Sequence, residues 1–164
     1  MIKIEKMKEN QNSLFKKPEQ LWSDFVAKNP SYKNAQMPLV EHFCDNEKDA
    51  NQLEQLTYDG TKTATCSLYA AYEMDNENLP KVGNLTIVTT WKGEARSILR
   101  VVKVSIRKFK DIDAVWARKE GEGDFSLDYW QKGHWAFFER ETKNYGLAPS
   151  ENMLLVCEEF ERIN

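Results

Sequence analysis

The sequence predicts an α+β domain built on a small, curved antiparallel sheet. Segments with helical spacing occupy the first half of the chain, and a block rich in valine, isoleucine and threonine follows them. Two more helical segments and a last apolar strand complete the order, which is not the regular alternation of a doubly wound sheet. The 164 residues fit one domain, which we assign to residues 18–164 after a lysine-rich arm over residues 1–17.

The helices of the first half are recognised by their ends. Pro18 suits the first turn of a helix, and apolar residues follow it at helical spacing for about three turns. A second helix begins near Asp45 or Asn46, which are good N-caps, and stops at Gly60, a common terminator. We therefore expect two helices before the stretch GTKTAT.

The stretch GTKTAT, residues 60–65, is expected to open a third helix with Thr63 or Thr65 as its N-cap. Lys62 and Thr65 would then lie at the helix N-terminus, where unpaired N–H groups and the helix dipole favour an anion or a carbonyl oxygen. A threonine cap beside an exposed lysine is common, and the spacing is not that of a P-loop. On spacing alone, an ordinary helix start is the stronger interpretation.

The second half of the chain is predicted as strands, then helices, then a strand. Between Pro80 and Phe109, turn signals at Gly83 and Gly93 and alternating apolar residues indicate a hairpin or meander. A short helix from Asp111 to Glu120 comes next, and Ser126 caps a longer one. The closing segment NMLLVCEEFERI is expected to be the final strand.

Residues around position 120 offer a second candidate site. Glu120 ends an apolar-faced helix, so partial burial is expected to raise its pKa toward neutrality. The following GEGD misses the spacing of a calcium loop, and a solvated loop is the favoured interpretation. His134 lies on the core-facing stripe of the last helix, where a structural histidine is favoured over a catalytic one. A tryptophan exposed beside Lys62 would be a stacking platform for a base.

Composition excludes several classes of protein. The net charge of −3 gives no global field to attract nucleic acid, so any RNA contact has to be local. Three cysteines without a C-x-x-C pair, and only two histidines, argue against a disulfide framework, a zinc site and a serine–histidine–acid triad. We expect no metal and no cofactor. The lack of a long apolar stretch predicts a cytoplasmic protein without a membrane partner.

The ordered motifs GTKTAT, LPKVGN and FKDIDAVWARKEGEGDFSLDYWQKGHWAFF resemble the ASCH domain family of the PUA-like superfamily. The similarity runs from about His42 to Glu161. Its most specific parts are the G-x-K turn at Gly60 and Lys62 and the segment EGEGD-x-S-L-x-x-W. The resemblance implies a small antiparallel β-barrel with flanking helices and a cleft beneath the G-x-K turn, which agrees with the curved sheet predicted above.

The bacterial branch that the chain resembles consists of N(4)-acetylcytidine amidohydrolases with a threonine, a lysine and a glutamate at the site. Carried over by motif, these residues are Thr65, Lys62 and Glu120. The resemblance implies that Thr65 attacks the amide carbonyl, that Lys62 takes its proton, and that Glu120 protonates the leaving amine. The helix N-terminus would hold the oxyanion, and Lys62 would need a lowered pKa.

The same resemblance implies substrate contacts and two alternative functions. The expected substrate-binding residues are Gly60, Thr63, Ser126 and Trp130, and the ligand is a modified pyrimidine nucleoside or RNA. One alternative is a non-catalytic RNA-binding module, favoured if the basic residues of the strand block form a stripe. The other is a metal-independent ribonuclease, in which Ser126 is implicated. A second family pattern, G-x-K-x-x-E-x-R, is not matched, because Thr65 and Ser67 occupy its last two positions.

Overall fold

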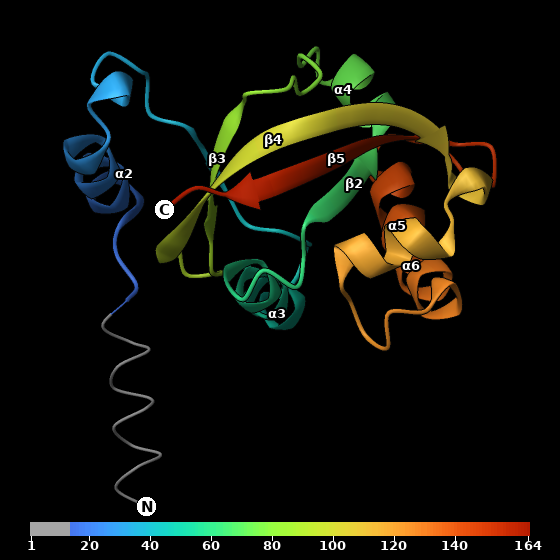
Figure 1. Cartoon of the computed structure of the whole chain (residues 1–164). Coiled ribbons are helices and arrows are strands. Elements are labelled where there is room, and N and C mark those ends of the chain that lie inside the picture. The colour runs from blue at the N-terminus through green and yellow to red at the C-terminus, as the bar shows by residue number, and fades with distance from the viewer. Residues whose placement is uncertain (1–13) are drawn as a thin grey trace, which may run out of the picture. The chain divides into compact units, whose positions relative to one another are not determined.

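The computed structural model describes residues 14–164 (Figure 1). The chain divides into two compact units. Unit 1 comprises the chain up to Tyr58 together with Leu85–Leu99 and Arg162–Asn164, and unit 2 comprises Asp59–Asn84 and Arg100–Glu161. The lysine-rich arm predicted over residues 1–17 lies outside the described residues, apart from residues 14–17.

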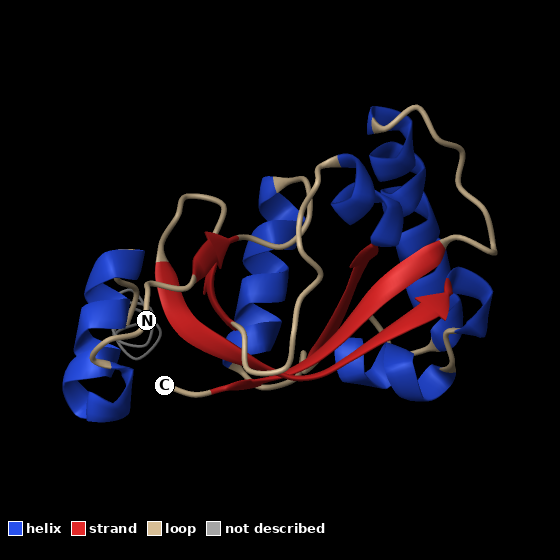
Figure 2. Cartoon of the chain, turned by 90° about the horizontal axis from the view of Figure 1, so that it is seen from above, coloured by secondary structure: helices blue, strands red, loops and turns tan. Residues whose placement is uncertain are grey.

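Five strands are hydrogen-bonded in the order β1-β3-β4-β5-β2. They are β1 (Leu39–Glu41), β2 (Ala64–Leu68), β3 (Leu85–Thr89), β4 (Ala95–Lys108) and β5 (Leu154–Arg162). The strands are curved (Figure 2), and this sheet with separate helices confirms the predicted α+β class. β2 and β5 pair antiparallel, but β1 pairs parallel with β3 and so departs from the expected antiparallel pattern. The connection between β1 and β3 contains helices, and such a long crossover permits parallel pairing.

Unit 1 carries the two helices predicted in the first half of the chain. Helix α2 spans Pro18–Lys28 and a 3-10 turn, Pro30–Tyr32, follows it. Helix α3 spans Glu47–Tyr58, and the Asn46 side chain accepts a hydrogen bond from the Asp49 N–H at 3.0 Å, which confirms Asn46 as the cap. The buried core of this unit consists of Leu21, Trp22, Phe25, Ile87, Ala95 and Ile98.

A buried ion pair joins α3 to the first part of β4 within unit 1. Arg96 donates from two nitrogens to the two carboxylate oxygens of Glu54, each at 2.9 Å. The rings of Phe15 and Tyr58 lie 4.3 and 4.0 Å from the guanidinium carbon. Because the guanidinium is held by a bidentate partner and by aromatic rings, this pair has the features of a structural contact.

Unit 2 carries the remaining helices. They are α4 (Tyr69–Met74), the 3-10 turn Phe109–Asp111, α5 (Ala114–Glu120) and α6 (Leu127–Asn144). Asp113 caps α5 and Ser126 caps α6, since their side chains accept hydrogen bonds from the N–H groups of Trp116 and Tyr129. Figure 1 shows α5 and α6 side by side, and both pack against β2. Their shared core includes Leu68, Phe109, Trp116, Trp130, Phe138 and Leu155.

The stretch behind Gly60 forms a strand and not the predicted helix. Residues Ala64–Leu68 pair with β5, and helix α4 begins only at Tyr69. The apolar spacing there is short enough to fit either structure, and the deciding partner strand lies near the C-terminus of the chain. Lys62 and Thr65 are therefore not at a helix N-terminus, and the predicted contribution of a helix dipole to oxyanion binding is wrong.

β2 presents alternate side chains to two opposite faces. The Phe160 N–H donates to the Thr63 carbonyl at 2.9 Å, so the backbone is already extended and paired at residue 63. Ala64 and Cys66 pack on the core that α5 and α6 cover. Because side chains alternate along a strand, Thr65 lies on the other face of β2.

The longest helix of the described residues, α6, has 18 residues and carries charged side chains along its length. Across residues 14–164, no helix combines the length and apolar character needed to cross a membrane.

Candidate functional site

Lys62 lies at the centre of a buried charged cluster in unit 2, formed by Lys62, Glu120, Glu122 and His134. The Nζ of Lys62 donates to Glu120 Oε2 at 3.0 Å and to Glu122 Oε1 at 2.9 Å. The side chains of Lys62 and Glu120 are each 1% exposed, that of His134 is 13% exposed and that of Glu122 is 21% exposed. Glu122 is therefore the member of the charged cluster that solvent reaches most easily.

The turn that ends α5 positions the charged cluster. Gly121 has a φ of +69°, and a Cβ at this residue would lie 2.4 Å from the carbonyl oxygen of Thr61. The N–H and the hydroxyl of Thr63 both donate to the Lys119 carbonyl, at 2.8 and 3.2 Å. The segment before β2 is thus held against the end of α5, where only glycine permits so close an approach.

Glu120 accepts hydrogen bonds from four N–H groups. Its Oε1 accepts from the indole Nε1 atoms of Trp116 and Trp130, at 2.7 and 3.0 Å. Its Oε2 accepts from Lys62 at 3.0 Å and contacts His134 Nε2 at 3.3 Å. Burial alone would raise the pKa of Glu120, but the positive charge of Lys62 and these donors outweigh burial and lower it. The prediction that burial shifts this pKa toward neutrality is wrong, and Glu120 is an anion at neutral pH.

The surroundings of His134 favour its doubly protonated form. Its Nδ1 lies 3.0 Å from the Trp130 carbonyl oxygen, and its Nε2 faces the Glu120 carboxylate. Both neighbours are acceptors, so both ring nitrogens act as donors, which is the pattern of an imidazolium. Burial opposes the charge, but the carboxylate of Glu120 raises the pKa of His134 above 6.5. The ring stacks on the Trp130 indole at a centroid distance of 4.1 Å.

Lys62 is also charged in this environment. Burial would lower its pKa, as a general base requires, but the carboxylates of Glu120 and Glu122 outweigh burial and raise the pKa instead. The predicted role of Lys62 as the base is therefore opposed by its surroundings. The ammonium is suited to donating a hydrogen bond to a developing negative charge.

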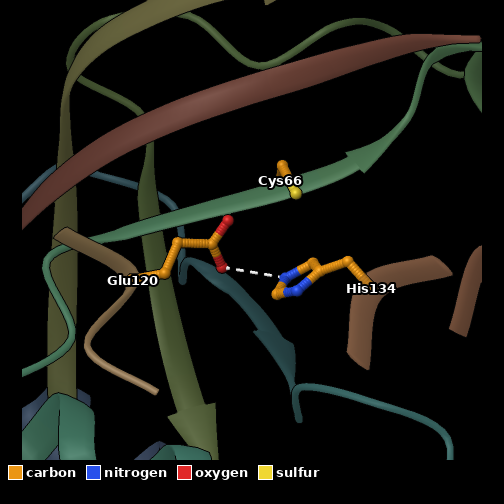
Figure 3. A group of neighbouring side chains, drawn as sticks. All are labelled: Cys66, Glu120 and His134. Atoms are coloured by element: carbon orange, nitrogen blue, oxygen red, sulfur yellow. Dashed lines mark hydrogen bonds and ion pairs between the residues drawn. The ribbon is translucent and has the colours of Figure 1, made fainter. Parts of the chain in front are cut away.

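Cys66 adds a thiol to the charged cluster (Figure 3). The figure shows Glu120 and His134 pointing toward one another below β2, and the donor atoms of these three residues lie within 4.8 Å of each other. Zinc accepts such a donor set. However, burial and Glu120 raise the pKa of the Cys66 thiol well above 9.0, and N–H donors occupy both oxygens of Glu120. Lys62 and His134 would have to give up their contacts first, so this is an ion-pair network and not a preformed metal site.

The structure brings together two of the three residues that the resemblance places in catalysis. Lys62 and Glu120 are in direct contact. Thr65 is half-buried on the face of β2 opposite to Cys66, so it does not point to the charged cluster. Gly60 has a φ of +77° with no atom within 4 Å of an added Cβ, so it forms an open turn before Lys62.

The other residues predicted to bind substrate have partners within the protein. Thr63 is exposed and bonded to Lys119, and Ser126 caps α6. Trp130 is 2% exposed, so it presents no open ring face for stacking. Its contribution to the site is the hydrogen bond that it donates to Glu120.

Three members of the site were missed as site residues by sequence reasoning. Glu122 lies in the segment predicted as a solvated loop, His134 was predicted to be structural, and Trp116 was not singled out. The spacing of Trp116 and Glu120, and of Trp130 and His134, is one helical turn in each case, which places each pair on one helix face. That spacing was visible in the sequence, but the convergence of the two faces required the packing of α5 against α6.

Three basic residues of β4 in unit 2 lie beside acids. Arg100 bonds to Glu161, Lys103 lies 3.6 Å from Glu159, and Arg107 lies 3.2 Å from Asp113. These acids reduce the positive charge that a basic stripe on β4 would offer to extended RNA.

Comparisons with known proteins agree with the resemblance. Residues 40–164 match the family model described as ASCH domain. The crystal structure of an ASCH domain from Lactobacillus crispatus JV V101 has a TM-score of 0.83 and 33% identity, covering 88% of this chain and 92% of that chain. The crystal structure of a protein from Enterococcus faecalis V583 has a TM-score of 0.81 and 36% identity, and the match covers 88% of this chain and 86% of that chain. Among curated proteins no match is found. These likenesses confirm the predicted PUA-like α+β fold.

Proposed function

This chain belongs to the ASCH domain family, and on that premise we propose that it is an amidohydrolase acting on an N-acylated pyrimidine nucleoside, with N(4)-acetylcytidine as the candidate substrate. One observation carries the proposal. The buried Lys62 donates hydrogen bonds to Glu120 and to the partly exposed Glu122, and His134 lies beside them.

The burial of Lys62 and Glu120, with two more charged groups beside them, supports a functional role for the charged cluster. Removing an ion from water costs several kcal/mol, and apolar residues in the same place are often as stable. Ionisable groups with shifted pKa values, gathered in one place, are typical of functional sites. The Arg96–Glu54 pair of unit 1 differs, because its two partners bind each other in a bidentate contact.

The charge states suggest a role for each residue of the cluster. When Glu122 turns away, Lys62 can donate a hydrogen bond to the amide carbonyl oxygen and stabilise the oxyanion of the tetrahedral intermediate. Glu122 takes a proton from the attacking water and passes it to the leaving amine, so Glu122 is a carboxylate again when the amine has left. Glu120 keeps His134 charged and oriented.

Water is the nucleophile that this geometry favours. Thr65 lies on the opposite face of β2 from the charged cluster, and Lys62 has a raised pKa and is poorly suited to accept its proton. The Thr65→Val variant separates the two mechanisms, since valine has the same shape without the hydroxyl. Retained turnover supports water, and loss of turnover in a folded variant supports Thr65.

The test is product detection by mass spectrometry with the purified protein, N(4)-acetylcytidine and, separately, a short RNA in EDTA. Release of cytidine and acetate supports the proposed function. An intact nucleoside together with cleaved RNA would contradict the proposal and favour the ribonuclease. No turnover of either would also contradict it and would leave a binding module.

A further inference from the structure

Solvent reaches the charged cluster most easily at Glu122. Glu122 has the most exposed side chain of the four members, at 21%, while Lys62 and Glu120 are closed off. The loop that carries Glu122 therefore lies where solvent has the most access to the charged cluster.

Tyr129 lies directly on that loop. An added Cβ at Gly123 would be 2.3 Å from two atoms of the Tyr129 ring, so the ring rests on the backbone one residue after Glu122. Gly123 has a φ of +57°, which also favours glycine. Tyr129 nevertheless stays 46% exposed, so part of its ring is open to a ligand.

Phe125 is a second exposed aromatic residue on the same loop. It is 46% exposed and has a φ of +65°, which is uncommon for a residue with a side chain. The loop is fixed on both sides, because the Phe125 N–H donates to the Glu122 carbonyl at 3.0 Å and the Ser126 N–H donates to Asp124 at 2.9 Å. An unfavourable backbone conformation thus holds an aromatic ring on the surface instead of in the core.

We propose that Tyr129 and Phe125 form an aromatic wall that stacks on the pyrimidine ring while its N-acyl group reaches Lys62. This inference rests on the proposed function and names the feature that selects its substrate, a flat heteroaromatic amine. Stacking on aromatic side chains is favourable for every base and needs no hydrogen bond to the base edge. The wall therefore favours an acylated nucleobase over an acylated aliphatic amine.

The test measures binding apart from turnover. Cytidine, the product, is titrated calorimetrically into the wild type, Tyr129→Leu and Tyr129→Phe. Tyr129→Leu is expected to weaken cytidine binding and to raise KM for N(4)-acetylcytidine by about tenfold with little change in kcat. Tyr129→Phe keeps the ring and is expected to retain wild-type values. Equal affinity of Tyr129→Leu and wild type would overturn the inference.

Phe125→Asn provides a second variant in which stability and binding change in different directions. Asparagine tolerates the left-handed backbone better than phenylalanine, so the melting temperature is expected to stay or rise. Loss of the ring is expected to weaken cytidine binding severalfold. Wild-type affinity in this variant would contradict a role for Phe125.

The outcomes separate this inference from the proposed function. If cytidine binding depends on Tyr129 but the protein hydrolyses no amide, the aromatic wall is supported and the amidohydrolase function is contradicted. Hydrolysis of N(4)-acetylcytidine with a KM that is unaffected by Tyr129→Leu would support the amidohydrolase and contradict the aromatic wall. A wild type that binds no cytidine at millimolar concentration would also refute the wall.

Discussion

At the scale of single residues, the carboxylate of Glu120 sets the charges around it. Two indole N–H groups bind one of its oxygens, and two cations bind the other. Indole groups can only donate, so they stabilise the ionised carboxylate and exclude its protonated form from that side. The neighbouring lysine and histidine are in turn kept positive, and the charged cluster has a net charge of zero.

Glu120→Gln is expected to destabilise the protein by about 3–5 kcal/mol, because two buried cations lose their shared anion. The glutamine side chain also carries an NH2 group, which would face other donors because all the groups that contact Glu120 donate hydrogen bonds. Urea unfolding measures the change. Glu159→Gln is the control, because Glu159 pairs with Lys119 and Lys103 near the surface and is expected to cost about 1 kcal/mol or less. Equal costs for both variants would contradict this account of Glu120.

The pH dependence of stability follows from two opposite shifts. The pKa of His134 is raised above 6.5, so its contribution is complete below that value and is lost as the pH rises through the pKa of the folded state. The pKa of Glu120 is lowered from 4.5, so its contribution is present above that value and is lost as the pH falls. Both contributions are complete between about pH 4.5 and 6.5. In an NMR titration, the His134 ring is expected to be protonated at pH 6.5, and a midpoint below 6.5 would contradict the imidazolium.

The charged cluster is also expected to bind zinc poorly. Zinc would have to displace protons from Cys66 and His134 and separate Lys62 from Glu120. Equilibrium dialysis at neutral pH, followed by metal analysis, is expected to show less than one zinc per chain. Stoichiometric zinc that is lost in Cys66→Ser would show that the cluster rearranges into a metal site.

At the scale of elements, the end of α5 determines whether the site forms. Gly121→Ala is expected to cost at least about 1 kcal/mol, because alanine disfavours the left-handed backbone and its Cβ would meet the Thr61 carbonyl at 2.4 Å. Turnover is expected to fall as well, since the turn holds both carboxylates beside Lys62.

Gly133→Ala is the matched control for this variant. Gly133 lies within α6, and an added Cβ there meets nothing within 4 Å, so alanine is expected to stabilise the helix by up to about 1 kcal/mol. Opposite signs of the two changes in a urea titration support the account. A neutral Gly121→Ala would show that the close approach to Thr61 is not needed.

Elements whose ends are defined by local chemistry were predictable from the sequence. Pro18, Asn46 and Ser126 mark the starts of α2, α3 and α6 because proline and capping residues act on their own helix. Strand β2 was mistaken for a helix, because its conformation depends on pairing with β5, which no local pattern reports. The direction in which the pKa of Glu120 shifts was predicted wrongly for a similar reason, because the four groups that donate to its carboxylate come from different parts of the chain.

At the scale of the whole chain, charge argues for a small ligand. The net charge is −3, and three basic side chains of β4 in unit 2, those of Arg100, Lys103 and Arg107, lie beside acidic partners. A short single-stranded RNA is therefore expected to bind no tighter than non-specific complexes do, in the range of about 1–100 μM at physiological salt. Fluorescence anisotropy at two salt concentrations measures this. Nanomolar affinity with a steep salt dependence would instead favour an RNA-binding module.

The most direct test of the central claim compares Lys62→Met with Lys119→Met in the hydrolysis of N(4)-acetylcytidine. Methionine keeps most of the side-chain length without the charge, and Lys119 is a lysine of the same unit that pairs with Glu159 outside the charged cluster. Lys62→Met is expected to lower turnover by about 100-fold or more, because the oxyanion loses its charged donor. Lys119→Met is expected to stay within about twofold of the wild type, because it removes only an ion pair near the surface. Equal turnover of the two folded variants would contradict a catalytic role for the buried lysine.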